Sequence, residues 1–361
     1  MSDTAITTRM AWPDVARGVS ILGVMTLHAT FEVPGGSDTV IAKANELIAM
    51  LRMPLFFLVA GFFARKVYRF NVVELFSKRI WFLLVPYLCW APVEIFFARL
   101  KLLRNLDVAM PTAEFYRETV VWGLNMYWFL WVLIIFTVVL WLTKAWPTWA
   151  QFALPVVVIA ATPWLLAHGN LSTPRLVAYL PLFLLGAYLR PAITWFADNA
   201  LRWQVAVSAI IVGGIAAVVH QFVIRGELVS ETFKPVVDVM ISIGLIPLGV
   251  LAAVILAKVP VLGAALMKVG RHTLVAYLGH PIALSIIFSL GIYGRVNIEP
   301  GADVVFETPT FWVLMCLVMC GLGAVVMYSI ARTPIVGWTI HPPKIAGFLE
   351  KKRAPLASSM P

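Results

Sequence analysis

The stretch RGVSILGVMTLH places an arginine, Arg17, and a histidine, His28, at the two ends of an otherwise apolar run. Eleven positions at about 100° each make three helical turns plus about 20°, so the two side chains share one helix face, about 16.5 Å apart along the axis. An imidazole at that depth can act as a general base, and ionisable groups inside a membrane mark functional sites. The alternative is that Arg17 anchors the helix at the inner surface and His28 is a hydrogen-bonded interior residue.

Further polar residues fall at matching depths in other apolar runs. Glu32 follows His28 by one turn and could orient the imidazole, while Asp14, behind Pro13, could cap the start of the same helix. Arg52 lies twelve residues from Ala64, about 18 Å by helical rise. Four more residues extend this set: Glu94, Asp238, His280 and Trp128. A water-accessible cavity with titratable walls explains the pattern, and unrelated ion pairs between helices are the alternative.

The composition shows which elements must position these groups. Of 361 residues, 61% are hydrophobic and 13% charged, about half the charged fraction of a soluble chain. The sequence has ten apolar segments, 15–32, 45–64, 80–98, 120–142, 150–167, 176–189, 203–224, 235–257, 272–293 and 310–331. Because backbone groups in lipid must pair internally, we predict an all-α, polytopic membrane protein with about ten transmembrane helices.

The charge distribution predicts the orientation. If the N-terminus is inside, inner segments carry 18 basic and 5 acidic residues, whereas outer ones carry 10 and 13. The net charge of +10 therefore reflects topology and not nucleic-acid binding, and both termini should be cytoplasmic. We expect one membrane domain over 1–340, with 259–267 at the inner interface, and a basic tail over 341–361. The three cysteines show no CxxC spacing, so no metal site is predicted.

Basic residues concentrate after the second apolar run. Positive-inside bias accounts for most of them, but they could also form a phosphate-binding patch with Arg17 at its edge. Five residues make this cluster: Arg65, Lys66, Arg69, Lys78 and Arg79. Phosphates at one membrane surface and a reactive centre deep in the bilayer suit a long ligand, and acyl-coenzyme A has that shape.

Six sequence blocks, in order, resemble the membrane acyltransferase-3 family. They are the Arg17 to His28 spacing, RMPLFFLVAGFFARK, KRIWFLLVPY, YWFLWVL, LPLFLLGAYL and GRHTLVAYLGHP. Together they span about residues 12–332, and the form of the motif at Arg52 is also similar to the glucan succinyltransferase branch. Two positions depart from the family pattern: Ala60 replaces a common serine, and Ala29 a common second histidine.

The resemblance implies ten transmembrane helices and transfer of an acyl group from acyl-coenzyme A, with no tightly bound cofactor. Acetyl is the default acyl group and succinyl the next. The acceptor would be a hydroxyl of an envelope sugar or glycolipid, and the location the inner cell membrane. Catalysis by the first-helix histidine carries over to His28, and a functional requirement for the arginine carries over to Arg17.

These expectations give each candidate residue a role. His28 would be the general base, and Glu32 would hold its tautomer. Arg52 would stabilise an oxyanion or bind the acceptor, and His280 is the second candidate base or a helix-packing residue. The coenzyme A phosphates would bind Arg17, Arg65, Arg69 and Arg79. The acceptor would contact Tyr127, Trp128, Glu94 and Asp238, although belt or core packing also explains the two aromatic residues.

A transporter or flippase is the competing class, because buried charges also bind substrates or relay protons. The sequence shows no internal repeat, which disfavours the repeat-built transporter folds. Binding of coenzyme A or release of its thiol would distinguish the two classes.

Overall fold

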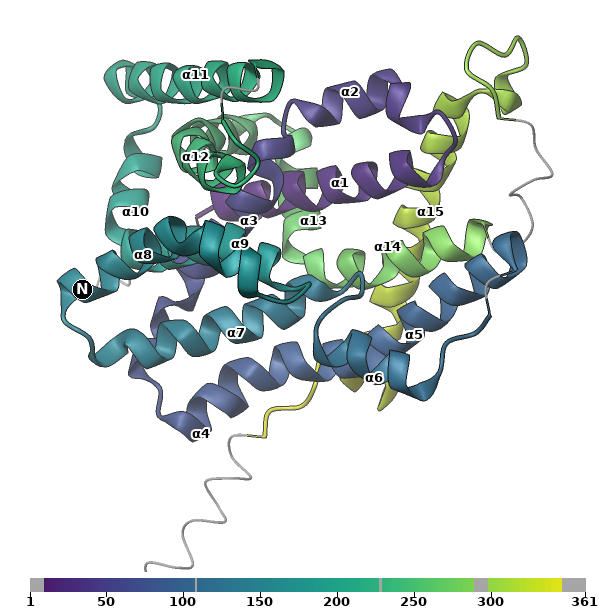
Figure 1. Ribbon diagram of the computed structural model, residues 1–361, viewed down its shortest axis with the longest axis horizontal. Coiled ribbons are helices and arrows are strands. Elements are labelled where there is room, and N and C mark those ends of the chain that lie inside the picture. The colour runs from purple at the N-terminus through teal and green to yellow at the C-terminus, as the bar shows by residue number, and fades with distance from the viewer. Residues whose placement is uncertain (1–9, 108, 227–228, 289–297, 346–361) are drawn as a thin grey trace, which may run out of the picture.

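The computed structural model describes residues 10–107, 109–226, 229–288 and 298–345, and the regular elements in these ranges are helical (Figure 1). The all-α prediction is therefore confirmed. The α-helices are α1 (Trp12–Glu32), α2 (Val40–Glu46), α3 (Ala49–Ala64), α4 (Val72–Leu75), α5 (Trp81–Leu106), α6 (Ala113–Val121), α7 (Trp128–Leu142), α8 (Thr148–His168), α9 (Thr173–Tyr188), α10 (Arg190–Asn199), α11 (Trp203–Gly226), α12 (Lys234–Lys258), α13 (Leu262–Arg271), α14 (Thr273–Ile287) and α15 (Pro309–Ile330). Short 3-10 or π segments are η1 (Gly36–Asp38), η2 (Arg65–Arg69), η3 (Phe76–Ile80), η4 (Thr143–Ala145), η6 (Val305–Glu307) and η7 (Val336–Thr339).

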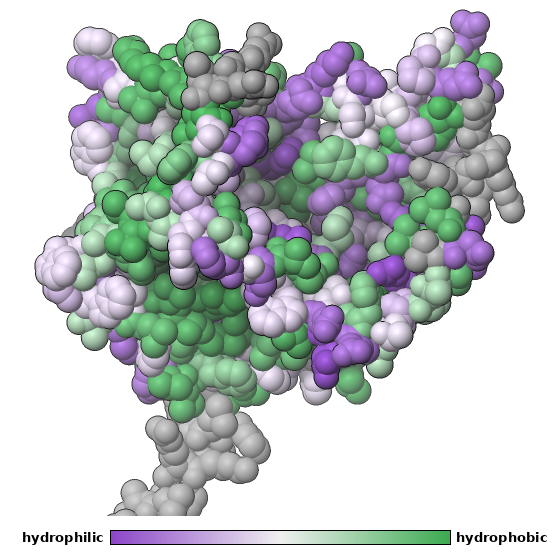
Figure 2. Space-filling model, viewed as in Figure 1, coloured by the Kyte–Doolittle hydropathy of each residue, from purple (hydrophilic) through white to green (hydrophobic). Residues whose placement is uncertain are grey.

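The chain is a multi-pass membrane protein. Six helices are long and apolar enough to cross a membrane, and counting the bent pairs α2–α3 (52°) and α9–α10 (76°) as single spans gives eight. The other two predicted segments correspond to α1, which carries several ionisable residues, and α14, a shorter apolar helix. Figure 2 shows apolar side chains over much of one face of the molecule. Exposed residues of α11, such as Ile211 and Phe222, belong to this kind of lipid-compatible surface.

Helix α1 is the central element of the site. It packs against α3, α12, α13 and α14, and it crosses the middle of the molecule in Figure 1. Asp14 does not cap this helix, because the N-cap is Ala11 and makes no side-chain capping hydrogen bond. Asp14 is instead buried in the first turn, where its Oδ2 atom lies 3.1 Å from Nε of Arg271 on α13. Most of residues 259–267 belong to α13, a short amphipathic helix that packs against α1 and pairs with its first turn.

Helices α3 and α9 approach to backbone contact through two glycines. A Cβ atom on Gly61 would lie 1.9 Å from the carbonyl oxygen of Phe183, and one on Gly186 would lie 2.1 Å from that of Leu58. Small residues permit such close packing between membrane helices. This contact fixes α3, which carries Arg52, against α9, which carries Tyr179.

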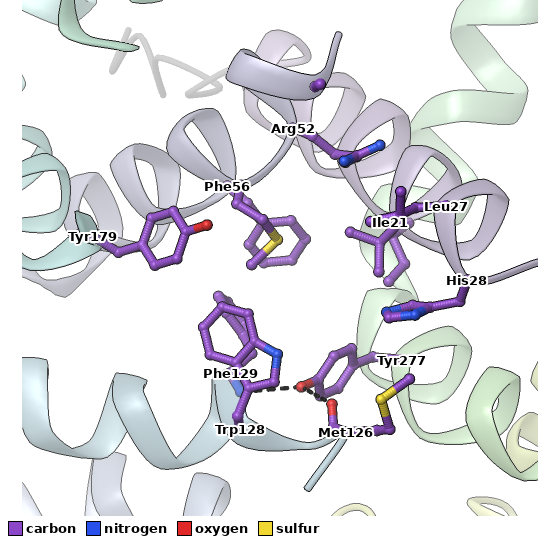
Figure 3. Close-up of a pocket in the computed structure, with 13 residues that line it drawn as sticks. Ile21, Leu27, His28, Arg52, Phe56, Met126, Trp128, Phe129, Tyr179 and Tyr277 are labelled. Carbon is purple, nitrogen blue, oxygen red and sulfur yellow. Dashed lines mark hydrogen bonds between the residues drawn. The ribbon is translucent and has the colours of Figure 1, made fainter. Parts of the chain in front are cut away.

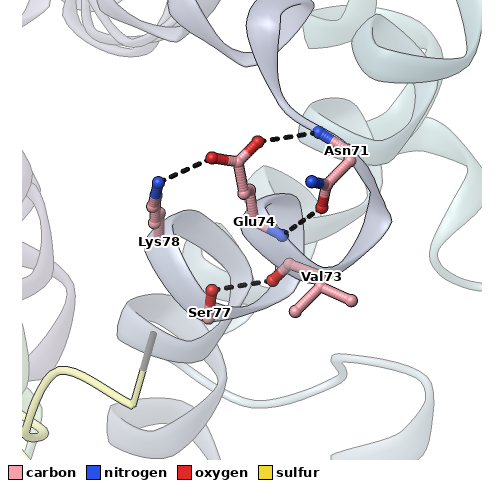
Figure 4. Close-up of polar contacts among 5 residues, drawn as sticks. All are labelled: Asn71, Val73, Glu74, Ser77 and Lys78. Carbon is pink, nitrogen blue, oxygen red and sulfur yellow. Dashed lines mark hydrogen bonds and ion pairs between the residues drawn. The ribbon is translucent and has the colours of Figure 1, made fainter. Parts of the chain in front are cut away.

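A local hydrogen-bond network begins the long helical stretch of α4, η3 and α5 (Figure 4). Asn71 Oδ1 accepts from the backbone N–H of Glu74 at 2.9 Å, and Glu74 Oε2 accepts from that of Asn71 at 3.1 Å, which is a capping box. Glu74 also pairs with Lys78 at 2.7 Å, and Ser77 donates to the carbonyl of Val73. The network positions the start of α5, on which Glu94 lies.

Candidate active site

His28 and Arg52 line one cavity of about 260 Å³ (Figure 3). Its other walls are mainly apolar and aromatic and come from α1, α3, α7, α9 and α14 together with the turn before α7. The lining residues are Ile21, Val24, Leu27, His28, Ala49, Arg52, Met53, Phe56, Met126, Trp128, Phe129, Tyr179 and Tyr277. We call this space the apolar cavity. It is larger than the roughly 150 Å³ needed to hold a benzene ring.

A second cavity of about 400 Å³ adjoins the first and opens more widely to the surface. It shares three lining residues with the apolar cavity: His28, Met126 and Trp128. Its remaining walls include several polar side chains, Glu94, Arg99, Thr119, Asn125 and Arg175. We call this space the polar cavity. The two names refer to the types of side chain in the walls, and His28 lines both cavities.

The imidazole of His28 stacks on a second histidine. The ring centroids of His28 and His280 are 5.5 Å apart and their planes are tilted by 29°. His280 is 1% exposed, and its Nδ1 lies 3.1 Å from the carbonyl oxygen of Ala276. Since it lines neither cavity, His280 supports His28 from behind. The spacing of the sequence did not predict this contact.

Glu32 does not reach the imidazole of His28. Both of its carboxylate oxygens accept hydrogen bonds from Nζ of Lys101 on α5, at 2.7 and 2.8 Å. Glu32 therefore pairs with Lys101 on α5 and not with His28, which lies one turn away on α1. Among the carboxylates that the structure describes, Glu94 is the one that shares a cavity with His28.

Arg52 reaches into the apolar cavity beside α1. Its Cδ atom would lie 2.8 Å from a Cβ on Gly23, so the absence of a side chain there gives the arginine its path. Its Nη1 donates to the carbonyl oxygen of Gly23 at 3.4 Å, and among the described residues Arg52 makes no ion pair. A positive charge at the wall of an apolar space can stabilise negative charge that develops there.

The turn before α7 is held from several sides. Met126 N–H donates to Glu94 Oε2 at 3.4 Å, and the carbonyl of Met126 accepts from the hydroxyl of Tyr277 at 2.7 Å. That hydroxyl also accepts from the N–H of Phe129 at 3.1 Å (Figure 3). Asn125 donates to the hydroxyl of Tyr87 at 2.9 Å. Met126 and Trp128, one and three residues after Asn125, are thereby held where the two cavities meet.

Two predicted acceptor contacts lie elsewhere. Tyr127 is fully buried, and its hydroxyl donates to the carbonyl of Leu278, so it braces α7 against α14 and lines neither cavity. Asp238 lies on α12 and also lines neither cavity. Trp128 does lie at the junction, with its ring 5.7 Å from that of Tyr179 and 5.1 Å from the guanidinium carbon of Arg175.

The predicted phosphate-binding arginines do not share one cavity. Arg65 donates to the carbonyl of Ala187 at 3.0 Å and lines a 570 Å³ surface cavity with Arg190 and Trp195. Arg17 lies over the ring of Phe63 at 4.8 Å. The other two lie elsewhere: Arg69 is exposed, and the half-buried Arg79 has an Nε atom without a hydrogen-bond partner among the described residues.

Buried aromatic rings lie along α3 between Arg52 and Arg65. Phe57 stacks on Tyr179 with centroids 4.7 Å apart and contacts Phe136 at 5.5 Å. The cavity at Arg65 and the apolar cavity have no lining residue in common. The structure thus describes two separate spaces at the ends of α3.

Sequence reasoning missed several residues of the site, namely Met126, Asn125, Arg175 and Tyr277. Asn125 could have been found as a polar residue directly before an apolar helix, and Arg175 as an arginine on the predicted outer side. Met126 and Tyr277 carry no such signal, because a methionine and a tyrosine in an apolar chain usually pack in the core.

Replacing Tyr277 with phenylalanine tests the role of this turn. The variant leaves the carbonyl of Met126 and the N–H of Phe129 without their buried partner, so we expect a loss of about 1–3 kcal/mol in stability. Thermal denaturation of the purified protein measures it. Tyr328→Phe is the matched control, because the Tyr328 hydroxyl makes no hydrogen bond among the described residues. Equal denaturation midpoints for both variants would contradict the bracing role.

Comparison with known proteins identifies the family to which the chain belongs. The profile of the acyltransferase domain of the acyltransferase-3 family matches residues 10–328, nearly the whole chain. Neither the curated proteins nor the solved structures give a significant match. The matched range contains α1 to α14 and both cavities at His28. The chain therefore belongs to the acyltransferase-3 family and is a multi-pass membrane acyltransferase.

Proposed function

We propose that the protein transfers an acyl group, acetyl by default, from acyl-coenzyme A to a hydroxyl of a cell-envelope carbohydrate or glycolipid. The observation that carries this proposal is the position of His28 between the apolar and polar cavities. A thioester with its acyl group in the apolar cavity and a sugar hydroxyl in the polar cavity would meet at this imidazole. Both partners then lie within reach of one general base.

His28 acts as the general base in this proposal. Its imidazole takes the proton of the acceptor hydroxyl as the hydroxyl oxygen attacks the thioester carbonyl. Arg52, which lines the apolar cavity together with His28, stabilises the oxyanion of the tetrahedral intermediate. The intermediate collapses when the carbon–sulfur bond breaks, and the imidazolium returns its proton to the departing thiolate. His280 holds the His28 ring in place, and a direct role for His280 is the second choice.

The polar cavity suits a carbohydrate acceptor. The carboxylate of Glu94 can accept hydrogen bonds from sugar hydroxyls, and Thr119 and Asn125 add polar groups to the same wall. Trp128 lines the same cavity and adds an aromatic side chain to its wall. Asp238 and Tyr127 have no place in this acceptor site, because neither lines the cavity.

The donor is proposed to bind from the cytoplasmic side. The excess of basic residues on that side predicts that the N-terminus and the end of α3 lie there. Arg65 and Arg190 line one cavity there together with Asp198, and the two guanidinium groups suit coenzyme A phosphates. Arg17, Arg69 and Arg79 are proposed as further contacts along the same surface. The thioester then has to pass the aromatic rings around Phe57 to reach His28.

Acyl transfer is tested with the purified protein in nanodiscs and labelled acetyl-coenzyme A. Envelope glycolipids and oligosaccharides serve as acceptors, and mass spectrometry identifies the product. We expect free thiol and acylated carbohydrate to form in equal amounts. Proton-coupled movement of a substrate across proteoliposomes without thiol release would contradict this function and favour a transporter or flippase.

A further inference from the structure

Met126 stands in the wall that separates the two cavities at His28. Its side chain lines both cavities, as do His28 and Trp128. The proposed function gives His28 the proton transfer. Trp128 is held between aromatic and cationic neighbours, with Phe57 at 6.1 Å and the guanidinium of Arg175 at 5.1 Å. The remaining member of the wall is an unbranched, aliphatic side chain.

The backbone of Met126 is fixed although its side chain is adaptable. Its N–H donates to Glu94 and its carbonyl accepts from Tyr277, so α5 and α14 hold it from two directions. Asn125 Oδ1 accepts from the N–H of Tyr127 at 2.9 Å and stiffens the same turn. Because the Cα position is fixed in this way, the volume of the side chain decides how much room remains at the wall. Methionine fills irregular space and adjusts to its neighbours.

We propose that Met126 is the partition that selects the length of the acyl group and shields the thioester from the water of the polar cavity. This proposal rests on the proposed function, in which the acyl group occupies the apolar cavity. With Met126 in its wall the apolar cavity has a volume of about 260 Å³, more than an acetyl group needs, so Met126 sets an upper limit of acyl length and not a limit of two carbons. The side chain of Met126 closes it where it meets the polar cavity.

Two consequences follow from removing this side chain. Met126→Ala joins the cavities of about 260 and 400 Å³, which makes room for longer acyl chains near His28. It also gives water access to the thioester from the polar cavity. A larger residue in Met126→Phe has the opposite effect on chain length. One extra or missing methylene group in an apolar pocket changes kcat/KM by about 10- to 200-fold, which sets the scale of the effect.

The test measures thiol release by purified protein in nanodiscs from acetyl-, butyryl-, hexanoyl- and octanoyl-coenzyme A. Each donor is used with trehalose as the acceptor and again without any sugar, because release without sugar reports hydrolysis. For Met126→Ala we expect the hexanoyl-to-acetyl ratio of kcat/KM to rise about tenfold, together with faster hydrolysis. For Met126→Phe we expect that ratio to fall.

Two control variants distinguish a specific effect of Met126 at the junction from a general effect of lost packing. Met315→Ala removes a partly buried methionine that lines neither cavity, and it should keep the wild-type chain-length profile. Met53→Ala enlarges the apolar cavity without opening it to the polar cavity, so hydrolysis should rise less than in Met126→Ala. Wild-type chain-length ratios and wild-type hydrolysis in both Met126 variants would overturn the partition. Absence of thiol release from every donor in the wild-type protein would instead overturn the proposed acyl transfer.

Discussion

Replacing His28 with alanine should reduce acyl transfer at least about a hundredfold, because a hydroxyl attacks a thioester slowly without a general base. The variant removes the group at the junction of the two cavities and leaves the polar residues of each wall in place. Helix α1 should form as before, since alanine favours helix. The measurement is turnover of labelled acetyl-coenzyme A by purified protein whose thermal denaturation midpoint has been checked.

The other histidines of the chain supply the controls for His28. His272→Ala removes an exposed imidazole that bonds to the carbonyl of Lys268, and this variant should keep its activity. His280→Ala removes the ring that stacks on His28, so its activity should fall less than that of His28→Ala. Full turnover by His28→Ala with loss in His280→Ala would transfer the role of base to His280.

Gly61→Val is expected to give the largest structural effect. The added Cβ would lie 1.9 Å from the carbonyl oxygen of Phe183, which belongs to the backbone of α9 and has no free rotation to escape. Helices α3 and α9 must separate, at a cost of at least about 3 kcal/mol. Because that cost is a large share of typical stability, we expect little monodisperse protein after size-exclusion chromatography. Any protein that remains should have a disturbed apolar cavity, since α3 carries Arg52 and Phe56.

Gly214→Val is the matched control for this helix contact. Gly214 lies within α11, another apolar helix, and a Cβ there would meet no atom within 4 Å. This variant should show the wild-type elution profile and denaturation midpoint. Equal behaviour of the two glycine variants would show that α3 and α9 do not depend on the close approach at Gly61.

The site draws its parts from helices that are distant in sequence. Arg52 comes from α3, His28 from α1, Glu94 from α5 and Tyr277 from α14. Each helix contributes a side chain to one or both cavities, and the turn before α7 is joined to Glu94 and Tyr277 through backbone hydrogen bonds. The separate apolar and polar spaces arise from this convergence and belong to no single helix.

The sequence by itself determined the class of this protein and marked candidate residues for its site. The low content of charge and the long apolar runs required membrane helices, because lipid offers no partner for an open backbone. The spacing from Arg17 to His28 fixed their common face, since helical periodicity is local. Arg52 and Glu94 could also be recognised from the sequence, because an ionisable side chain within an apolar run is visible there.

The tertiary structure decided which of these groups meet. Glu32 is one turn from His28, yet it pairs with Lys101, because a direct ion pair with another helix is closer than the imidazole. Asp14 likewise pairs with Arg271 and does not cap its own helix. The stacking of His280 on His28 and the place of Met126 between two cavities depend on how separate helices pack. The face that a helical residue occupies depends only on its position along the chain, so the sequence predicts it. Contacts between helices depend on side-chain volumes across the whole bundle, so they follow only from the tertiary structure.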